Sequence, residues 1–298
     1  MFPLINKWLS FVRFSHTVFA LPFSLAAMVV AARENRGWPG WRTFGLILAA
    51  MVCARTCAMA FNRIMDRKFD ALNPRTANRH LPTGDISLTS AWLLWGVSGA
   101  GLVVASWFLN LLCFVLSPIA LFVICFYSVT KRFTDYTHVF LGVALALAPV
   151  GAWLAVKGAN VSGWEIVQMT VLAAAVVLWL VGFDLIYALQ DYEFDRKHGL
   201  HSLVVAWGPK NALSAAFLTH MIMCGVLLVF GFLCLFRIAY LVGWFLIVAC
   251  LVLEHWIARR RNLSWINVAF FRLNAVVSVV FLAVVAAEVI FQGGFRLR

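Results

Sequence analysis

Charged residues are scarce in this chain of 298 residues, at 12%, and the acidic ones are the scarcest, with 12 Asp and Glu against 24 Lys and Arg. A soluble domain has about 25% charged residues, so this composition excludes an ordinary soluble protein. Hydrophobic residues make up 63% of the chain, which indicates an integral membrane protein. The sequence also lacks a polar linker long enough to separate two domains, so we expect a single membrane-embedded domain over residues 1–298.

The cysteine patterns of disulfide frameworks and zinc sites are absent as well. The seven cysteines are an odd number, they all lie in apolar stretches, and no C-x-x-C occurs. We therefore expect small buried hydrophobic side chains at these positions. The net charge of +12 does not indicate nucleic-acid binding, because the basic residues cluster between apolar segments, where they set membrane topology.

Long apolar runs are what the sequence has in abundance. A helix that crosses a bilayer needs about 20 mostly apolar residues, and helices satisfy every backbone polar group inside lipid. The fold predicted is all-α with nine transmembrane helices, the first of them retained rather than cleaved as a signal peptide. The candidate spans are 16–32, 41–61, 91–109, 111–129, 137–156, 164–187, 211–235, 239–257 and 267–291.

The basic residues divide unequally between the two sides of this nine-span arrangement. One side holds 17 of the 24 Lys and Arg residues, including those of the two longer polar loops at about 62–90 and 188–210. The positive-inside rule places this side and the N-terminus in the cytoplasm and the C-terminus outside. We expect a bacterial cell inner membrane, with any chemistry on the cytoplasmic face beneath these two cap loops.

Two of the scarce acidic residues stand four apart in FNRIMDRKFDALN, and the same pattern returns 125 residues later in IYALQDYEFDRKHG. In this alignment Asn62 matches Tyr187, and both segments end an apolar span. Asp66 and Asp70 in the first segment correspond to Asp191 and Asp195 in the second. Residues at i, i+4 and i+8 share one face of a helix, so each block is expected to present two carboxylates at its cytoplasmic end.

Like charges at this spacing repel, and ions at the edge of lipid are costly, so these carboxylates require a compensating cation. Mg²⁺ binds through one or two carboxylates plus phosphate oxygens. The sequence therefore predicts that Asp66, Asp70, Asp191 and Asp195 hold two Mg²⁺ ions around a diphosphate. The alternative is that these acids pair with their neighbours on a solvated face, namely Arg67, Lys68, Arg196 and Lys197.

Three further groups lie near these motifs. Tyr127 and Lys131 end the fourth span four residues apart, and Lys131 is suited to neutralise a departing diphosphate. Asp184 lies about 10 Å deeper than Asp191 on the sixth span. Arg55 lies at the equivalent depth on the second span. Asp184 and Arg55 either pair with each other or flank a polar acceptor that Asp184 orients or deprotonates.

The motifs resemble those of the UbiA superfamily of intramembrane prenyltransferases, in which the first runs Asn-x-x-x-Asp-x-x-x-Asp and the second Asp-x-x-Tyr-x-x-x-Asp-x-x-x-Asp. The second is seen here as Asp184, Tyr187, Asp191 and Asp195. The segments RTANRHLPTG, YSVTKR and RFSHTVFALPFSL look like the 4-hydroxybenzoate polyprenyltransferase branch. One departure is Arg63, where the family often has Asp, and we expect Arg63 to contact phosphate instead.

The resemblance implies nine helices around a central cavity that opens laterally to lipid and is capped by the two cytoplasmic loops. It implies that Asn62, Lys131 and Arg13 bind the diphosphate, with Asp184 and Arg55 near an aromatic acceptor and Mg²⁺ on the four carboxylates. The expected activity is transfer of a polyprenyl group from an allylic diphosphate to an aromatic quinone precursor. The acceptor expected first is 4-hydroxybenzoate (ubiquinone route), and the alternative is a naphthoate (menaquinone route).

Two other classes of protein place acids in lipid. A divalent-cation transporter needs them near the bilayer midplane, whereas these lie at span ends. A CDP-alcohol phosphotransferase carries an Asp-Gly-x-x-Ala-Arg signature, which is absent here. The partners expected are therefore a polyprenyl diphosphate, a small aromatic acceptor and membrane lipid; the sequence leaves protein partners open.

Overall fold

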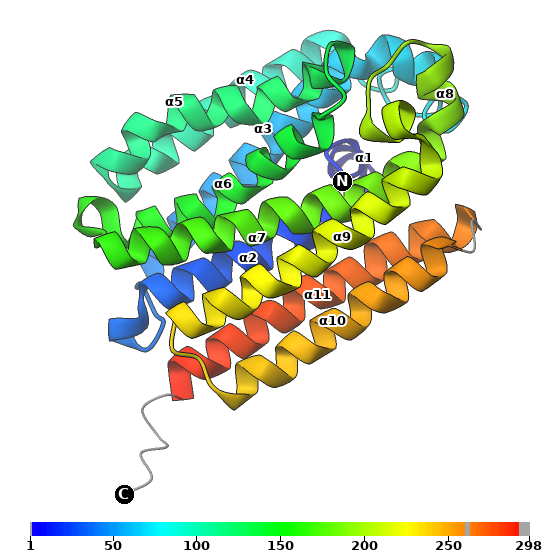
Figure 1. The fold of residues 1–298 in the computed structure, drawn as a ribbon. Coiled ribbons are helices and arrows are strands. Elements are labelled where there is room, and N and C mark those ends of the chain that lie inside the picture. The colour runs from blue at the N-terminus through cyan, green and yellow to red at the C-terminus, as the bar shows by residue number, and fades with distance from the viewer. Residues whose placement is uncertain (1, 260–262, 292–298) are drawn as a thin grey trace, which may run out of the picture.

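The computed structural model describes residues 2–259 and 263–291, and within these ranges the chain is built of helices (Figure 1). Nine of the helices in the described part are long and apolar enough to cross a membrane, which confirms the predicted number. Their α-helical parts are α2 (Thr17–Ala31), α3 (Trp41–Leu72), α4 (Leu88–Leu109), α5 (Leu111–Phe126), α6 (Thr137–Lys157), α7 (Gly163–Ala188), α9 (Leu203–Leu233), α10 (Ile238–Arg259) and α11 (Leu263–Phe291). The first span also includes the 3₁₀ turn Phe14–His16, and the fourth includes the 3₁₀ turn Tyr127–Arg132.

The helices pack in chain order and close on themselves. Neighbours along the chain contact one another from α3 to α7, α7 packs on α9, α9 on α10 and α10 on α11. Helix α2 packs against both α11 and α6, and so closes a ring with α6, α7, α9, α10 and α11. In Figure 1 the long helices run roughly parallel or antiparallel, and the short α8 (Tyr192–Lys197) lies at one end of the bundle.

Apolar side chains occupy both the core and the outer faces of the bundle, as expected for a protein whose solvent is lipid. Large rings pack in the interior between α2, α7 and α11, where Phe23 stacks on Phe281 with centroids 4.7 Å apart and contacts Trp179. Outward positions such as Trp107, Leu111 and Phe232 are exposed. Exposed apolar surface on this scale is expected where lipid tails replace water.

Several helix ends differ from the predicted spans for identifiable reasons. The second span was expected to end at residue 61, but α3 continues to Leu72, so FNRIMDRKFD forms its last turns rather than the start of a loop. The segment Leu203–Leu233 begins before the predicted 211 and contains a break at Gly208 (φ 77°), followed by Pro209. Proline cannot continue a helical hydrogen-bond ladder, so the spanning part begins after this break.

The two cap segments are compact. The loop between α3 and α4 covers residues 73–87, and Ser87 closes it by capping α4 through the Ser90 amide. The second cap contains the 3₁₀ turn η5 (Leu189–Asp191) and α8, and its His201 amide donates to the Lys131 carbonyl. Four residues counted in the charge asymmetry, Arg260, Arg261, Arg296 and Arg298, lie outside the described residues.

Candidate active site

A cavity of about 290 Å³ lies at the end of the bundle beneath the two cap segments. Its lining comes from α3, α6 and α7, from the loop after α3, and from the 3₁₀ turn η3 (Tyr127–Arg132). All twelve predicted site residues line this one cavity, from the N-terminal turn to α8. They are Arg13, Arg55, Asn62, Arg63, Asp66, Asp70, Tyr127, Lys131, Asp184, Tyr187, Asp191 and Asp195.

The first motif lies on one face of α3, as the spacing predicted. The Asn62 side-chain amide donates to Asp66 Oδ2 at 3.0 Å, which fixes the orientation of that carboxylate. Asp70 Oδ1 accepts from Arg79 at 2.5 Å, and its backbone carbonyl accepts from the Thr76 hydroxyl. The second carboxylate oxygen, Oδ2 of Asp70, is buried and has no hydrogen-bond partner among the described residues.

The second motif departs from the expected continuous helix face. The α-helix ends at Ala188, Asp191 closes the 3₁₀ turn η5, and Asp195 belongs to the separate helix α8. A 3₁₀ turn has three residues per turn instead of 3.6, so it changes the direction in which the following side chains point. Tyr187 and both acids still line the cavity, because the chain bends over it at this turn.

Arg75 from the loop after α3 connects the two motifs. Its Nε donates to Asp191 Oδ1 at 2.8 Å, its Nη2 donates to Asp191 Oδ2, and its Nη1 donates to the Tyr187 hydroxyl at 2.9 Å. Asn73 adds a further hydrogen bond to Asp191 Oδ1. Burial alone would lower the pKa of Arg75, but the hydrogen bonds that it donates to Asp191 and Tyr187 outweigh burial and raise the pKa, so the guanidinium stays charged.

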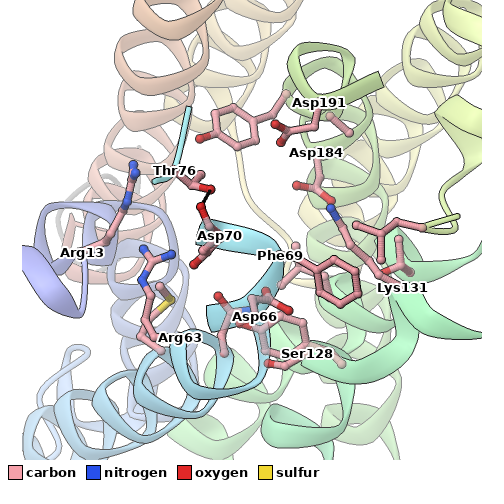
Figure 2. A pocket seen from close by; sticks show the side chains of 18 of the residues that line it. Arg13, Arg63, Asp66, Phe69, Asp70, Thr76, Ser128, Lys131, Asp184 and Asp191 are labelled. Carbon is pink, nitrogen blue, oxygen red and sulfur yellow. Dashed lines mark hydrogen bonds between the residues drawn. The ribbon is translucent and has the colours of Figure 1, made fainter. Parts of the chain in front are cut away.

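Lys131 faces the second motif from η3, with its Nζ 3.7 Å from Asp195 Oδ2. Tyr127 and Lys131 were expected to share a face of an α-helix, but the segment is 3₁₀, in which residues four apart point in different directions. Both side chains nevertheless line the cavity. Figure 2 shows Asp66 and Asp70 on one side, and Lys131, Asp184 and Asp191 on the other.

The alternative pairing of the acids with their sequence neighbours is wrong. The structure pairs three of the four acids with cations that line the cavity, namely Asp70 with Arg79, Asp191 with Arg75 and Asp195 with Lys131. The fourth, Asp66, accepts from the Asn62 amide. Sequence reasoning did not assign roles to Arg75, Arg79 and Asn73. Their signal was present in NPRTANR, directly after the first motif, but only the fold shows that this loop turns back over the cavity.

The donor chemistry of the cavity fits Mg²⁺ with a phosphate ligand. Two buried carboxylate oxygens, Asp70 Oδ2 and Asp195 Oδ2, have no hydrogen-bond partner among residues 2–259 and 263–291, and they come one from each motif. Within the described ranges, no three His, Cys, Asp or Glu side chains converge into a ready-made metal site. This suits a cation that takes most of its ligands from a diphosphate and water.

The deeper end of the cavity holds a contact that the sequence did not indicate. Asp184 Oδ2 lies 2.6 Å from Nδ1 of His138, a fully buried residue at the start of α6. Arg55 donates instead to the Arg13 carbonyl at 3.2 Å, so the suggested pairing of Arg55 with Asp184 is wrong. Asp184 is therefore oriented by His138 at the cavity wall.

A second cavity, of about 220 Å³, lies between α2, α3, α4, α5 and α6 and is lined mostly by Ala, Leu, Ile and Met. Arg55, Met59, Tyr127, Leu141 and Leu145 line both cavities. The polar cavity thus adjoins an apolar one, an arrangement that suits a ligand with a charged head and a hydrocarbon tail.

Comparison with known proteins agrees with this geometry. The UbiA prenyltransferase family model matches residues 20–276. Among curated relatives, a 4-hydroxybenzoate octaprenyltransferase of Paraburkholderia phytofirmans is 27% identical over 96% of this chain and 98% of its own. A protein of the same name from Pseudomonas aeruginosa is 30% identical over 76% of this chain and 74% of its own.

Two solved structures share the fold. A UbiA homologue from Aeropyrum pernix K1 superposes with a TM-score of 0.82 at 32% identity, covering 92% of this chain and 98% of that one. A UbiA homologue from Archaeoglobus fulgidus bound to GPP and Mg²⁺ superposes with a TM-score of 0.68 at 24% identity, covering 95% and 99%. The two motifs that face each other across the cavity are the ones whose spacing resembled this group, and the chain belongs to the UbiA prenyltransferase family.

Proposed function

We propose that this protein transfers a polyprenyl group from an allylic polyprenyl diphosphate to 4-hydroxybenzoate. The observation that carries the proposal is the pair of carboxylate motifs facing each other across a cavity rich in arginine, next to an apolar cavity. A diphosphate head fits the first cavity and the start of a prenyl chain fits the second. The curated relatives named 4-hydroxybenzoate octaprenyltransferase support the acceptor and the chain type.

The residues divide between the two halves of the reaction. Asp66, Asp70, Asp191 and Asp195 would hold Mg²⁺, which supplies positive charge that stabilises the leaving diphosphate. The Archaeoglobus homologue with the same fold is bound to GPP and Mg²⁺, which supports this assignment. Arg75 and Arg79 neutralise Asp191 and Asp70 in the structure, and we propose that they turn to the phosphate oxygens when the substrate binds.

Further cationic side chains would bind the diphosphate. Lys131, the nearest cation to Asp195, would pair with the diphosphate as charge develops on it. Arg13 and Arg63 line the same cavity on the side of Asp70 (Figure 2), and with Asn62 they would contact phosphate. Tyr127 and Tyr187 would border the bound prenyl diphosphate.

At the acceptor end, Arg55 would bind the carboxylate of 4-hydroxybenzoate and Asp184 would accept its phenolic proton. Loss of this proton makes the ring electron-rich, so that it attacks the allylic carbon. The apolar helices around the site exclude water from the allylic cation.

We also propose where in the cell the protein lies. The chain is a multi-span membrane protein, and the distribution of basic residues favours a bacterial inner membrane with the cavity on the cytoplasmic side. One domain over residues 1–298, with the two cap segments closing the cavity, is the organisation that we propose.

The test is a prenyl transfer assay with purified protein, geranyl diphosphate, Mg²⁺, and either 4-hydroxybenzoate or a dihydroxynaphthoate. Prenylated hydroxybenzoate should form, and EDTA or Asp191→Asn should lower its rate at least a hundredfold. If only the naphthoate is prenylated, the acceptor is of the menaquinone type and not 4-hydroxybenzoate. Product formed equally well in EDTA would contradict the proposed role of Mg²⁺.

A further inference from the structure

His138 is a buried titratable residue to which the proposed mechanism gives no role. It is the second residue of α6, its side chain is 0% exposed, and it does not line either cavity. Imidazole is expensive to bury without hydrogen bonds, and apolar side chains fill most positions on the inner faces of these helices. Its presence behind the cavity wall therefore requires an explanation.

The contact to Asp184 gives one. The His138 Nδ1 lies 2.6 Å from Asp184 Oδ2, and Asp184 in turn lines the cavity, so the imidazole lies behind the carboxylate. Thr137, the preceding residue, is fixed by a hydrogen bond between its hydroxyl and that of Thr130 in η3. The start of α6 is thus held in place, and with it the imidazole.

The second ring nitrogen decides the protonation pattern. His138 Nε2 is buried and has no hydrogen-bond partner in the part of the chain that the structure describes. Buried N–H groups without an acceptor are rarer than acceptors without a donor, so the proton belongs on Nδ1, where it is donated to the Asp184 carboxylate. A charge-assisted hydrogen bond of this kind holds a carboxylate in one rotamer and leaves its other oxygen, Oδ1, for the cavity.

We propose that His138 is a positioning residue for deprotonation of the aromatic acceptor, acting through Asp184. This rests on the proposed function. As the C–O bond of the prenyl diphosphate breaks, its electron pair leaves with the diphosphate, and a ring carbon ortho to the hydroxyl bonds to the allylic carbon. The phenolic proton passes to Asp184 Oδ1. The ring hydrogen then leaves as a proton on the diphosphate, and Asp184 returns its proton to the phenol oxygen.

Two substitutions separate this role from packing. His138→Phe keeps a ring of similar size and removes the N–H, whereas His138→Asn keeps an amide N–H that mimics Nδ1–H. A matched control is His201→Phe, which removes a similar His–Asp contact (3.0 Å to Asp135) at an exposed position that does not line the cavity and keeps the backbone amide of residue 201. Thermal unfolding in detergent confirms which variants are folded.

The decisive readout compares two acceptors. In His138→Phe, kcat with 4-hydroxybenzoate should fall by about 10- to 100-fold, while KM for geranyl diphosphate stays within about twofold. With 3-fluoro-4-hydroxybenzoate, whose phenol is more acidic and needs less help from a base, the loss relative to wild type should be several times smaller. His138→Asn should recover most of the rate, and His201→Phe should match wild type.

Each contrary outcome is distinct. Equal losses with both acceptors, or equal losses in the Asn and Phe variants, would overturn the proposal, because a purely structural residue behaves in this way. If His138→Phe does not fold, a tenfold loss of kcat in folded His138→Asn overturns it. Failure of the wild-type protein to prenylate either acceptor contradicts the proposed function itself, which the wild-type reaction reports independently of the variants.

Discussion

Arg75 donates to both oxygens of Asp191, 116 residues further along the chain, and so joins the loop after the first motif to the second motif. The same guanidinium lies over the Tyr187 ring, 5.4 Å from its centroid. Arg79 makes the corresponding contact with Asp70. In this structure arginines of one cap loop neutralise one carboxylate of each motif, at the places where we propose that metal and diphosphate bind.

Removal of Arg75 should therefore make the protein more dependent on Mg²⁺ for stability. Arg75→Ala leaves Asp191, only 8% exposed, without its main counter-cation, and should destabilise the fold by about 1–3 kcal/mol. Added Mg²⁺ should raise the melting temperature of this variant more than that of wild type, because the cation takes the place of the guanidinium. Arg67→Ala is the control, since within the described residues Arg67 hydrogen-bonds only the Ile64 carbonyl of its own helix. Equal Mg²⁺-induced shifts of the melting temperature in wild type, Arg75→Ala and Arg67→Ala would contradict the replacement of the guanidinium by the cation.

Lys131 should act on the leaving group rather than on binding of the acceptor. Lys131→Ala is expected to lower kcat for prenyl transfer by about a hundredfold, with KM for 4-hydroxybenzoate nearly unchanged. Lys131→Arg should retain part of the rate because it keeps the charge but changes its geometry. Steady-state kinetics with both substrates varied would show the split, and a change confined to KM for the acceptor would speak against this role.

The apolar cavity should limit which prenyl chains are accepted. Ala148 lines this cavity and not the polar one, so Ala148→Phe fills space without touching the carboxylates. The variant should lose about tenfold or more with long polyprenyl diphosphates and little with geranyl diphosphate. Val97→Phe, at an outward position that is 71% exposed, serves as the control. Equal effects of Ala148→Phe on short and long prenyl diphosphates would show that the prenyl chain does not bind in the apolar cavity.

Gly182 should be required for close packing of α7 on α9. A Cβ atom at this position would lie 2.2 Å from the His220 ring, which is itself fixed by hydrogen bonds to His255 and to the Trp179 carbonyl. Gly182→Ala is therefore expected to destabilise the protein by about 1–3 kcal/mol. A Cβ atom at Gly151 in α6 would meet no described atom within 4 Å, so Gly151→Ala should be neutral or slightly stabilising. Thermal unfolding in detergent compares the two variants, and equal melting temperatures would show that α9 shifts to admit the methyl group.

The scarcity of charge and the nine apolar runs were enough to predict the class of fold, because a segment in lipid must satisfy its own backbone as a helix. The spacing of Asn62, Asp66 and Asp70 was enough to place three side chains on one face, because a helix repeats every 3.6 residues. Both are local properties of the chain. The repeated acidic motif, which is also local, was enough to indicate the family.

Tertiary structure decided which charges meet. The return of Arg75 across the cavity and the hydrogen bond between His138 and Asp184 join segments that are far apart in sequence, and the 3₁₀ turn at Asp191 changes the direction in which the second motif points. Each depends on how packed helices orient their ends, which no local pattern records. The sequence thus determined the membrane helices and the two acidic motifs, and only the packing of those helices determined the partners of each carboxylate.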